Sequence, residues 1–161
     1  MSNGKPNYPQ RGGQPGGKPK FGGGGPNQQD DQSKQKVNEI TARIRALDYL
    51  SAYNARQLVE DAKTLADISK RKELKTAQIR KIYGTVKELE LTMRTKGFQY
   101  DRVVFLLPKL AYAANKKREV DNLQEVLSAC IDKIREDANT GKEDFHRFVN
   151  FFEAILAYHR G

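Results

Sequence analysis

The sequence has few residues of the kinds that bind metals or carry out catalysis. Its 161 residues include one cysteine, two histidines and no tryptophan. The single Cys130 excludes an internal disulfide, and with two histidines as the other soft ligands we expect no metal site and no cofactor. His146 and His159 are 13 residues apart, roughly 20 Å along a helix, so we expect surface or capping roles for both. No nucleophile–base pair, metal-ligand spacing or phosphate-binding glycine loop is present, which predicts a protein that is not an enzyme.

Long apolar runs are also lacking. The longest covers residues 103–114 and contains Lys109, well short of the roughly 20 residues that cross a bilayer. No apolar segment follows the first methionine, as a secretory signal would require. We therefore expect a cytoplasmic protein with no membrane partner, in which Cys130 is a small buried hydrophobic residue on a helix.

Glycine and proline are concentrated near the N-terminus. Residues 1–26 hold 9 of the 13 glycines and 5 of the 6 prolines. Such a segment buries too little apolar surface to offset the loss of its backbone entropy. The sequence predicts a disordered basic tail over residues 1–30 and a helical domain over residues 31–161. One Arg-Gly-Gly triplet at residues 11–13 is a weak indication of RNA contact, and we favour a solvated, dispensable tail.

Beyond the tail, apolar residues recur at three- and four-residue spacing, and no segment alternates with period two. This pattern predicts an all-α fold, a compact bundle of five or six helices. We expect a first helix over about residues 31–50, a second opened by a capping box of Asn54 and Gln57, and a third capped by Thr76.

The second half of the chain adds three expectations. The run at residues 103–114 is apolar on every side, which predicts a helix in the middle of the bundle that kinks or restarts at Pro108. Residues 139–141 are expected to form a turn, and the aromatic stripe over residues 145–152 is expected to face the core. A solvated acidic surface is expected from Asp132, Glu136, Asp137, Glu143 and Asp144.

Positive charge is gathered in one segment. Residues 69–118 contain 14 Lys or Arg and 4 Asp or Glu, a net charge of +10, whereas the whole chain carries +9. Such a field attracts a polyanion, because neutralising phosphates releases counterions. The alternative is a solubilising surface with an uneven distribution of charge. Spaced single cations favour contact with a nucleic-acid backbone over recognition of a base sequence.

Within this segment, Arg80, Gly84 and Lys87 share one face of the expected third helix. Gly84 weakens that helix by about 1 kcal/mol relative to alanine, which indicates close approach of a nucleic-acid backbone or close packing of another helix. Lys109 interrupts the apolar run, so its ammonium must extend to solvent or meet an anion. Residues 116–118 add a cationic cluster just beyond that run.

Three stretches of the sequence together resemble one family. They are LKTAQIRKIY at residues 74–83, LPKLAYAA at residues 107–114 and FEAILAYH at residues 152–159. In this order they resemble the small helical subunit of type III-A CRISPR effector (Csm) complexes, over roughly residues 55–160. Family members often follow the tyrosine of the second stretch with a Gly-Arg pair, where this chain has Asn115 and Lys116. By this resemblance, the tail and the helix over residues 37–50 look like additions to the family core.

The resemblance implies a non-catalytic structural subunit of an antiviral ribonucleoprotein, present in several copies along a filament. It would line the groove that holds the guide–target RNA duplex and hold it through backbone phosphates. Its partners would be guide RNA, target RNA, the backbone and large subunits of the complex, and neighbouring copies of itself. The predicted RNA-binding residues are Arg80, Lys81, Lys87, Lys109, Tyr112, Lys116, Lys117 and Arg118. The acidic surface would dock a basic partner or the next copy.

Two alternatives stay open at this point. One is a helical protein–protein adaptor or dimerisation module without nucleic-acid binding, whose dimer seam would be the aromatic stripe over residues 145–152. The other is a hydrolase that uses His146 and Glu153, which are seven residues apart on one helix face.

Overall fold

The computed structural model describes residues 24–160 of the chain. In this range every regular element is helical, and six α-helices have eleven residues or more. They are α1 (Gly24–Arg45), α2 (Ala55–Arg71), α3 (Thr76–Lys96), α5 (Leu106–Lys116), α6 (Asp121–Ile131) and α7 (Ala138–Arg160). A short helix, α4 (Tyr100–Val104), precedes α5, and 3-10 turns cover Leu50–Ala52 and Arg118–Val120. The predicted all-α bundle is confirmed.

The chain divides into two units, Met1–Ser33 and Lys34–Gly161. Of the predicted disordered tail over residues 1–30, residues 1–23 lie outside the described range, and the division at residue 30 stays a prediction. Helix α1 begins at Gly24, earlier than the expected start near residue 31. Pro26 is compatible with this start, because a proline in the first turn of a helix removes an N–H that has no partner there.

Helix α1 also ends at Arg45, earlier than the expected residue 50. After it, the chain turns toward the loop that precedes α7. The N–H of Leu50 donates to the carbonyl of Lys133 (2.9 Å), and the N–H of Ser51 donates to the carboxylate of Asp144 (2.8 Å). These hydrogen bonds to distant residues take the place of the helical hydrogen bonds that would have continued α1 to residue 50. Local periodicity does not predict such long-range bonds.

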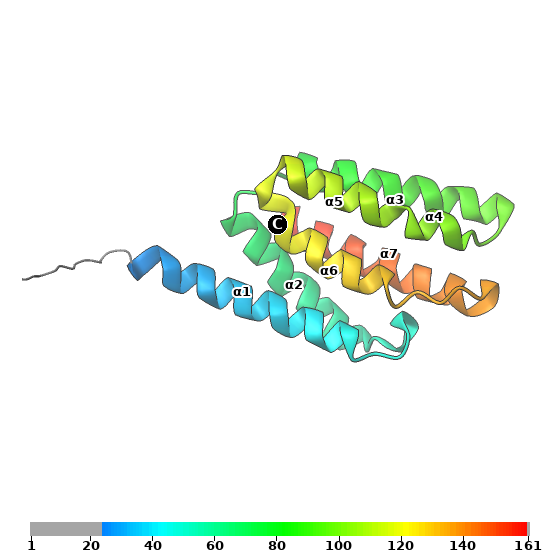
Figure 1. Ribbon diagram of the computed structural model, residues 1–161, viewed down its shortest axis with the longest axis horizontal. Helices are drawn as coiled ribbons and strands as arrows, with labels where there is room; N and C mark the ends of the chain where they lie inside the picture. Colours follow the sequence, from blue (N-terminus) through cyan, green and yellow to red (C-terminus); the bar gives the residue numbers. More distant parts are fainter. Residues whose placement is uncertain (1–23, 161) are drawn as a thin grey trace, which may run out of the picture. The chain divides into compact units, whose positions relative to one another are not determined.

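Helices α6 and α7 lie in the middle of the Lys34–Gly161 unit, with α2 on one side and α3, α4 and α5 on the other (Figure 1). The aromatic stripe of α7 is buried, and Phe148, Phe151 and Phe152 have no exposed surface. The ring of Phe151 lies 5.5 Å from that of Tyr53, and the ring of Phe152 lies 5.2 Å from that of Tyr83. The stripe is therefore core, as predicted, and it leaves no rings for a dimer seam.

The apolar run at residues 103–114 does not lie in the middle of the bundle. It is divided at Phe105 into α4 and α5, so the helix restarts at Leu106, two residues before Pro108, where the restart was expected, and Pro108 lies in the first turn of α5. Leu106 and Leu110 face the core, whereas Phe105 and Tyr112 are 61% and 64% exposed. A helix that is apolar all round does not reveal in its sequence which side its neighbours cover, and here one side faces solvent.

The predicted cap of α2 is confirmed in part. The side chain of Asn54 accepts a hydrogen bond from the N–H of Gln57 (3.0 Å). The amide of Gln57 donates instead to Asp61 (2.9 Å), so the reciprocal bond of a capping box is not formed. Asp61 is buried and also accepts from Arg43 and from the hydroxyl of Tyr53. This carboxylate thus joins α1 to α2.

Thr76 does not cap α3, and His159 is not a surface residue. The N-cap is Lys75, whose N–H donates to the side chain of Gln78 (2.8 Å). The imidazole of His159 is 5% exposed, with Nε2 2.8 Å from the carbonyl of Leu74 and Nδ1 3.1 Å from the hydroxyl of Thr76. Because a carbonyl only accepts, Nε2 carries the proton and Thr76 donates to Nδ1. The end of α7 thereby fixes the start of α3.

The predicted turn at residues 139–141 is wrong, because these residues lie within α7. Glycine is required at position 141 for close packing, since a Cβ there would lie 2.6 Å from the Phe98 ring and against the carbonyl of Arg135. The predicted solvated acidic surface is also corrected at one position. Asp144 is fully buried and accepts from the guanidinium of Arg135 (2.9 Å), so this carboxylate stabilises the fold.

Candidate nucleic-acid interface

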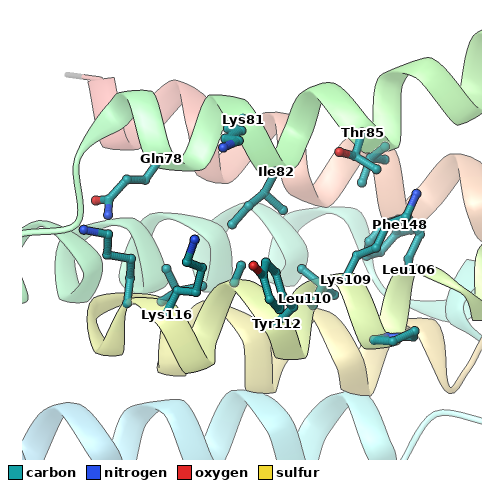
Figure 2. Close-up of a pocket in the computed structure, with 15 residues that line it drawn as sticks. Gln78, Lys81, Ile82, Thr85, Leu106, Lys109, Leu110, Tyr112, Lys116 and Phe148 are labelled. Carbon is teal, nitrogen blue, oxygen red and sulfur yellow. The ribbon is translucent and has the colours of Figure 1, made fainter.

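A groove of about 560 Å³ runs between α3 and α5. Gln78, Lys81 and Thr85 come from α3, and Lys109, Tyr112 and Lys116 from α5 (Figure 2). The floor is apolar and includes a ring from α7. Its residues are Ile82, Val86, Leu106, Leu110 and Phe148. The two helices that flank the groove come from the segment in which the sequence gathers its positive charge.

Four lysines surround this groove without an acidic partner. Lys81, Lys109, Lys116 and Lys117 are exposed, and none forms an ion pair with another residue of the described range 24–160. Lys116 and Lys117 lie at the C-terminal end of α5, where cations are favoured by the helix dipole. All four ammonium groups are thus available to an anion from outside the unit.

The groove continues into a second hollow of about 580 Å³. Thr85, Leu106 and Lys109 line both hollows, and the second adds Arg102 and Phe105. Together the two hollows are lined by five cationic side chains and one acidic side chain, Glu88. Cationic side chains therefore outnumber acidic ones in both hollows.

One wall of the groove alternates aromatic and cationic side chains. Phe105, Lys109, Tyr112 and Lys116 follow one another at spacings of four, three and four residues, which places them on one helix face. Phe105 keeps helical dihedral angles (φ −68°, ψ −9°) between α4 and α5, so the row crosses the junction of the two helices. The ammonium of Lys116 lies 5.5 Å from the centre of the Tyr112 ring. These four side chains are named the aromatic–lysine stripe.

Five of the eight residues predicted from the sequence line the groove. They are Lys81, Lys109, Tyr112, Lys116 and Lys117. The sequence did not single out Arg102 and Phe105, which line the second hollow. Phe105 lies in an apolar run that was expected to be core. The sequence feature that could have identified it as a groove residue is its spacing from Lys109 and Tyr112, which places the three on one helix face.

The other three predicted residues, Arg80, Lys87 and Arg118, do not line the groove. Lys87 lies on the side of α3 that faces α7, with its ammonium 2.7 Å from Glu90 and 3.5 Å from Glu153. The hydrogen bond from Lys87 to Glu90 raises the pKa of the lysine. Arg80 and Lys87 are seven residues apart in α3 and share one helix face, as expected, but that face does not line the groove that Lys109 lines.

Gly84 faces open space, with no heavy atom within 4 Å of the position that a Cβ would take. Close packing of another helix at Gly84, one of the two explanations offered by the sequence, is therefore not seen within the unit. The position is exposed and lies outside the residues that line the groove.

The residues considered for hydrolysis do not come together. His146 is exposed on α7, and seven residues along the same helix, about 10 Å by its rise, Glu153 accepts a hydrogen bond from Tyr83 (2.7 Å). Within residues 24–160, no group of three or more His, Cys, Asp or Glu side chains is placed to hold a metal ion. The described helices include none that is long and apolar enough to cross a membrane.

Comparison with known proteins identifies a family. A family model described as Csm2 Type III-A matches residues 52–161, more than half of the chain. The matched segment contains α2 to α7, and with them both walls of the groove and the three stretches that carried the resemblance. Among curated proteins and among solved structures no match was found.

Proposed function

The chain belongs to the Csm2 type III-A family, and from that premise we propose that its α3–α5 groove holds RNA by the phosphate backbone. Members of this family are structural subunits of the type III-A CRISPR complex. In that complex the groove would receive RNA where guide and target pair, and this subunit would have no catalytic role.

The observation that carries the proposal is the set of four lysines around one groove that have no acidic partner among residues 24–160. A lysine ammonium is a compact charge on a flexible stem, which suits phosphate but does not fix the identity of a base. Recognition of sequence is then left to base pairing, as in other RNA-guided systems. The groove would supply affinity and position.

Residues outside the groove have secondary roles in this proposal. Arg80 and Arg118 are exposed and raise the positive potential near the groove, whereas much of the charge of Lys87 is balanced by Glu90 and Glu153. The exposed acids Glu136 and Glu143 would dock a basic surface of a backbone or large subunit, or the next copy of this chain. The complex would act in the cytoplasm.

The test is the salt dependence of RNA affinity for the full chain. Fluorescence anisotropy with a labelled RNA duplex is measured over a series of salt concentrations for the wild type and for Lys109→Glu with Lys116→Glu. Each lost phosphate contact reduces the slope of log K against log salt by roughly 0.7 to 0.9. The double variant should therefore bind more weakly at moderate salt, with a slope reduced by about 1.5.

The matched control reverses two exposed lysines on other helices, Lys63→Glu on α2 and Lys142→Glu on α7. It changes the net charge by the same amount but leaves the groove intact. The control should keep most of the wild-type slope. Equal losses in the two double variants would assign binding to net charge, and unchanged binding in the groove variant would show that the groove is not the RNA site.

A further inference from the structure

We propose that the aromatic–lysine stripe also binds unpaired RNA bases, by stacking them on Tyr112 and Phe105. The inference rests on the proposed function and adds a class of ligand to it: RNA with unpaired nucleotides, in preference to a continuous duplex.

The first argument is the exposure of the two rings. Phe105 and Tyr112 are 61% and 64% exposed, whereas the rings of α7 that form the core have almost no exposed surface. Both exposed rings line the electropositive groove, Tyr112 in the first hollow and Phe105 in the second. An aromatic face in such a position offers a base a stacking surface that does not depend on its identity.

The second argument is the alternation of rings with cations. Lys109 lies between the two rings in sequence and lines both hollows, and the ammonium of Lys116 lies 5.5 Å from the centre of the Tyr112 ring. A base stacked on Tyr112 would bring its own phosphates next to these lysines. Proteins that bind single strands combine the same two elements, aromatic platforms and a positively charged track for the backbone.

The charge of the stripe favours this ligand over an apolar protein surface. A partner helix that covered Phe105 and Tyr112 would also bury Lys109 and Lys116, and burial of an unpaired charge is costly. A continuous duplex supplies phosphates, but its bases are already stacked on one another and are not free to stack on a side chain. An RNA strand with unpaired bases can both stack its bases on the two rings and place its phosphates next to the lysines.

The test compares two single strands of about twelve nucleotides that carry the same number of phosphates. One has a mixed, unstructured sequence, and the other has abasic sites throughout. Affinities are measured for the wild-type full chain, for Phe105→Leu with Tyr112→Leu, for Tyr112→Phe, and for Tyr158→Leu. Tyr158 is an exposed tyrosine of α7 that does not line the groove, so it serves as the matched control.

We expect the wild type to bind the intact strand more tightly than the abasic strand. The double leucine variant should bind the intact strand about tenfold more weakly, equivalent to about 1.4 kcal/mol, with an unchanged salt slope because the lysines remain. It should also lose the difference between the two strands. Tyr112→Phe keeps the ring and should bind as the wild type does, and so should Tyr158→Leu.

Equal wild-type affinity for both strands, or wild-type affinity in the double variant, would overturn the stacking proposal. If binding then kept its dependence on salt, the phosphate contacts would still stand. Absence of salt-dependent binding to either strand and to duplex would overturn the proposed function itself. Self-association of the chain that is lost in Tyr112→Leu would show that a second copy covers the stripe, which also contradicts base stacking.

Discussion

Arg135 and Asp144 form a two-pronged ion pair between the loop before α7 and α7 itself. The guanidinium Nε lies 2.9 Å from Oδ2 and Nη2 lies 3.2 Å from Oδ1 of the carboxylate. Asp144 has no exposed surface and also accepts from the N–H groups of Ser51 and Arg135. Burial opposes its charged form, but these bonds outweigh burial and hold the pKa of Asp144 below its usual value. One carboxylate therefore joins three segments of the chain.

Asp144→Asn should destabilise the protein. The substitution keeps the size of the side chain but removes the charge that the guanidinium of Arg135 requires, with an expected cost of about 2–4 kcal/mol. The free energy of unfolding is measured in urea. The matched control is Asp132→Asn, because Asp132 is exposed and 3.7 Å from Arg45, and its loss should cost less than about 1 kcal/mol. Similar losses in both variants would contradict the assigned role of Asp144.

His159 should make stability depend on pH near neutrality. Burial, with a smaller effect from the nearby Lys70, holds the pKa of His159 below its usual value, which is about 6.5 in an unfolded chain. As pH falls through about 6.5, the unfolded chain takes up a proton that the folded protein does not, so stability decreases. Above that pH the contribution of the neutral imidazole is fully present.

The measurement is the free energy of unfolding between about pH 5 and pH 7. His159→Gln should reduce the increase of stability with pH over this range, whereas His146→Gln, at an exposed position, should keep the wild-type profile. A slope that persists in His159→Gln and disappears in His146→Gln would show that the wrong histidine has been assigned.

Replacing Gly84 of α3 and Gly141 of α7 with alanine should change the stability of the protein in opposite directions. Gly84→Ala should stabilise the protein by up to about 1 kcal/mol, because alanine favours the helix and nothing lies within 4 Å of its Cβ. Gly141→Ala should destabilise it by about 1–3 kcal/mol through overpacking, since the new methyl would meet the Phe98 ring. Thermal unfolding of the two variants measures both effects. A loss of stability in Gly84→Ala would contradict the open environment of that position.

Cys130 should be inert in the folded protein. It has no exposed surface, and burial, with the nearby charge of Asp61, raises the pKa of its thiol. Reaction with a thiol reagent at mildly alkaline pH should be about a hundredfold slower or more for the folded chain than in urea. Rapid reaction without denaturant would show that α6 is not packed as described.

The sequence predicts the class of fold and the four lysines of the groove, for reasons that are local. Helical periodicity and the cap at Asn54 depend on neighbours within four residues. The groove lysines were found because they lie in one charged segment, and Lys109 because it interrupts an apolar run.

What the sequence does not predict depends on distant partners. Lys87 was grouped with the groove lysines because the packing of α3 against α7, which turns Lys87 toward Glu153, 66 residues away, is a tertiary contact. His159 was expected to have a surface or capping role because its hydrogen-bond acceptor, the carbonyl of Leu74, is 85 residues away. Phe105 was assigned to the core because an apolar run does not indicate which of its sides will be covered. In each case tertiary contacts determine the environment of the side chain, and the local sequence pattern does not predict those contacts.

The central claim is that RNA occupies the groove between α3 and α5, and lysine labelling of the full chain with and without RNA tests it most directly. The chain is treated with a lysine-acylating reagent, and the modified residues are identified by mass spectrometry. We predict that RNA protects Lys81, Lys109, Lys116 and Lys117, while Lys63 and Lys142 react equally in both states. Protection of Lys63 and Lys142 with no change at the four groove lysines would contradict the account.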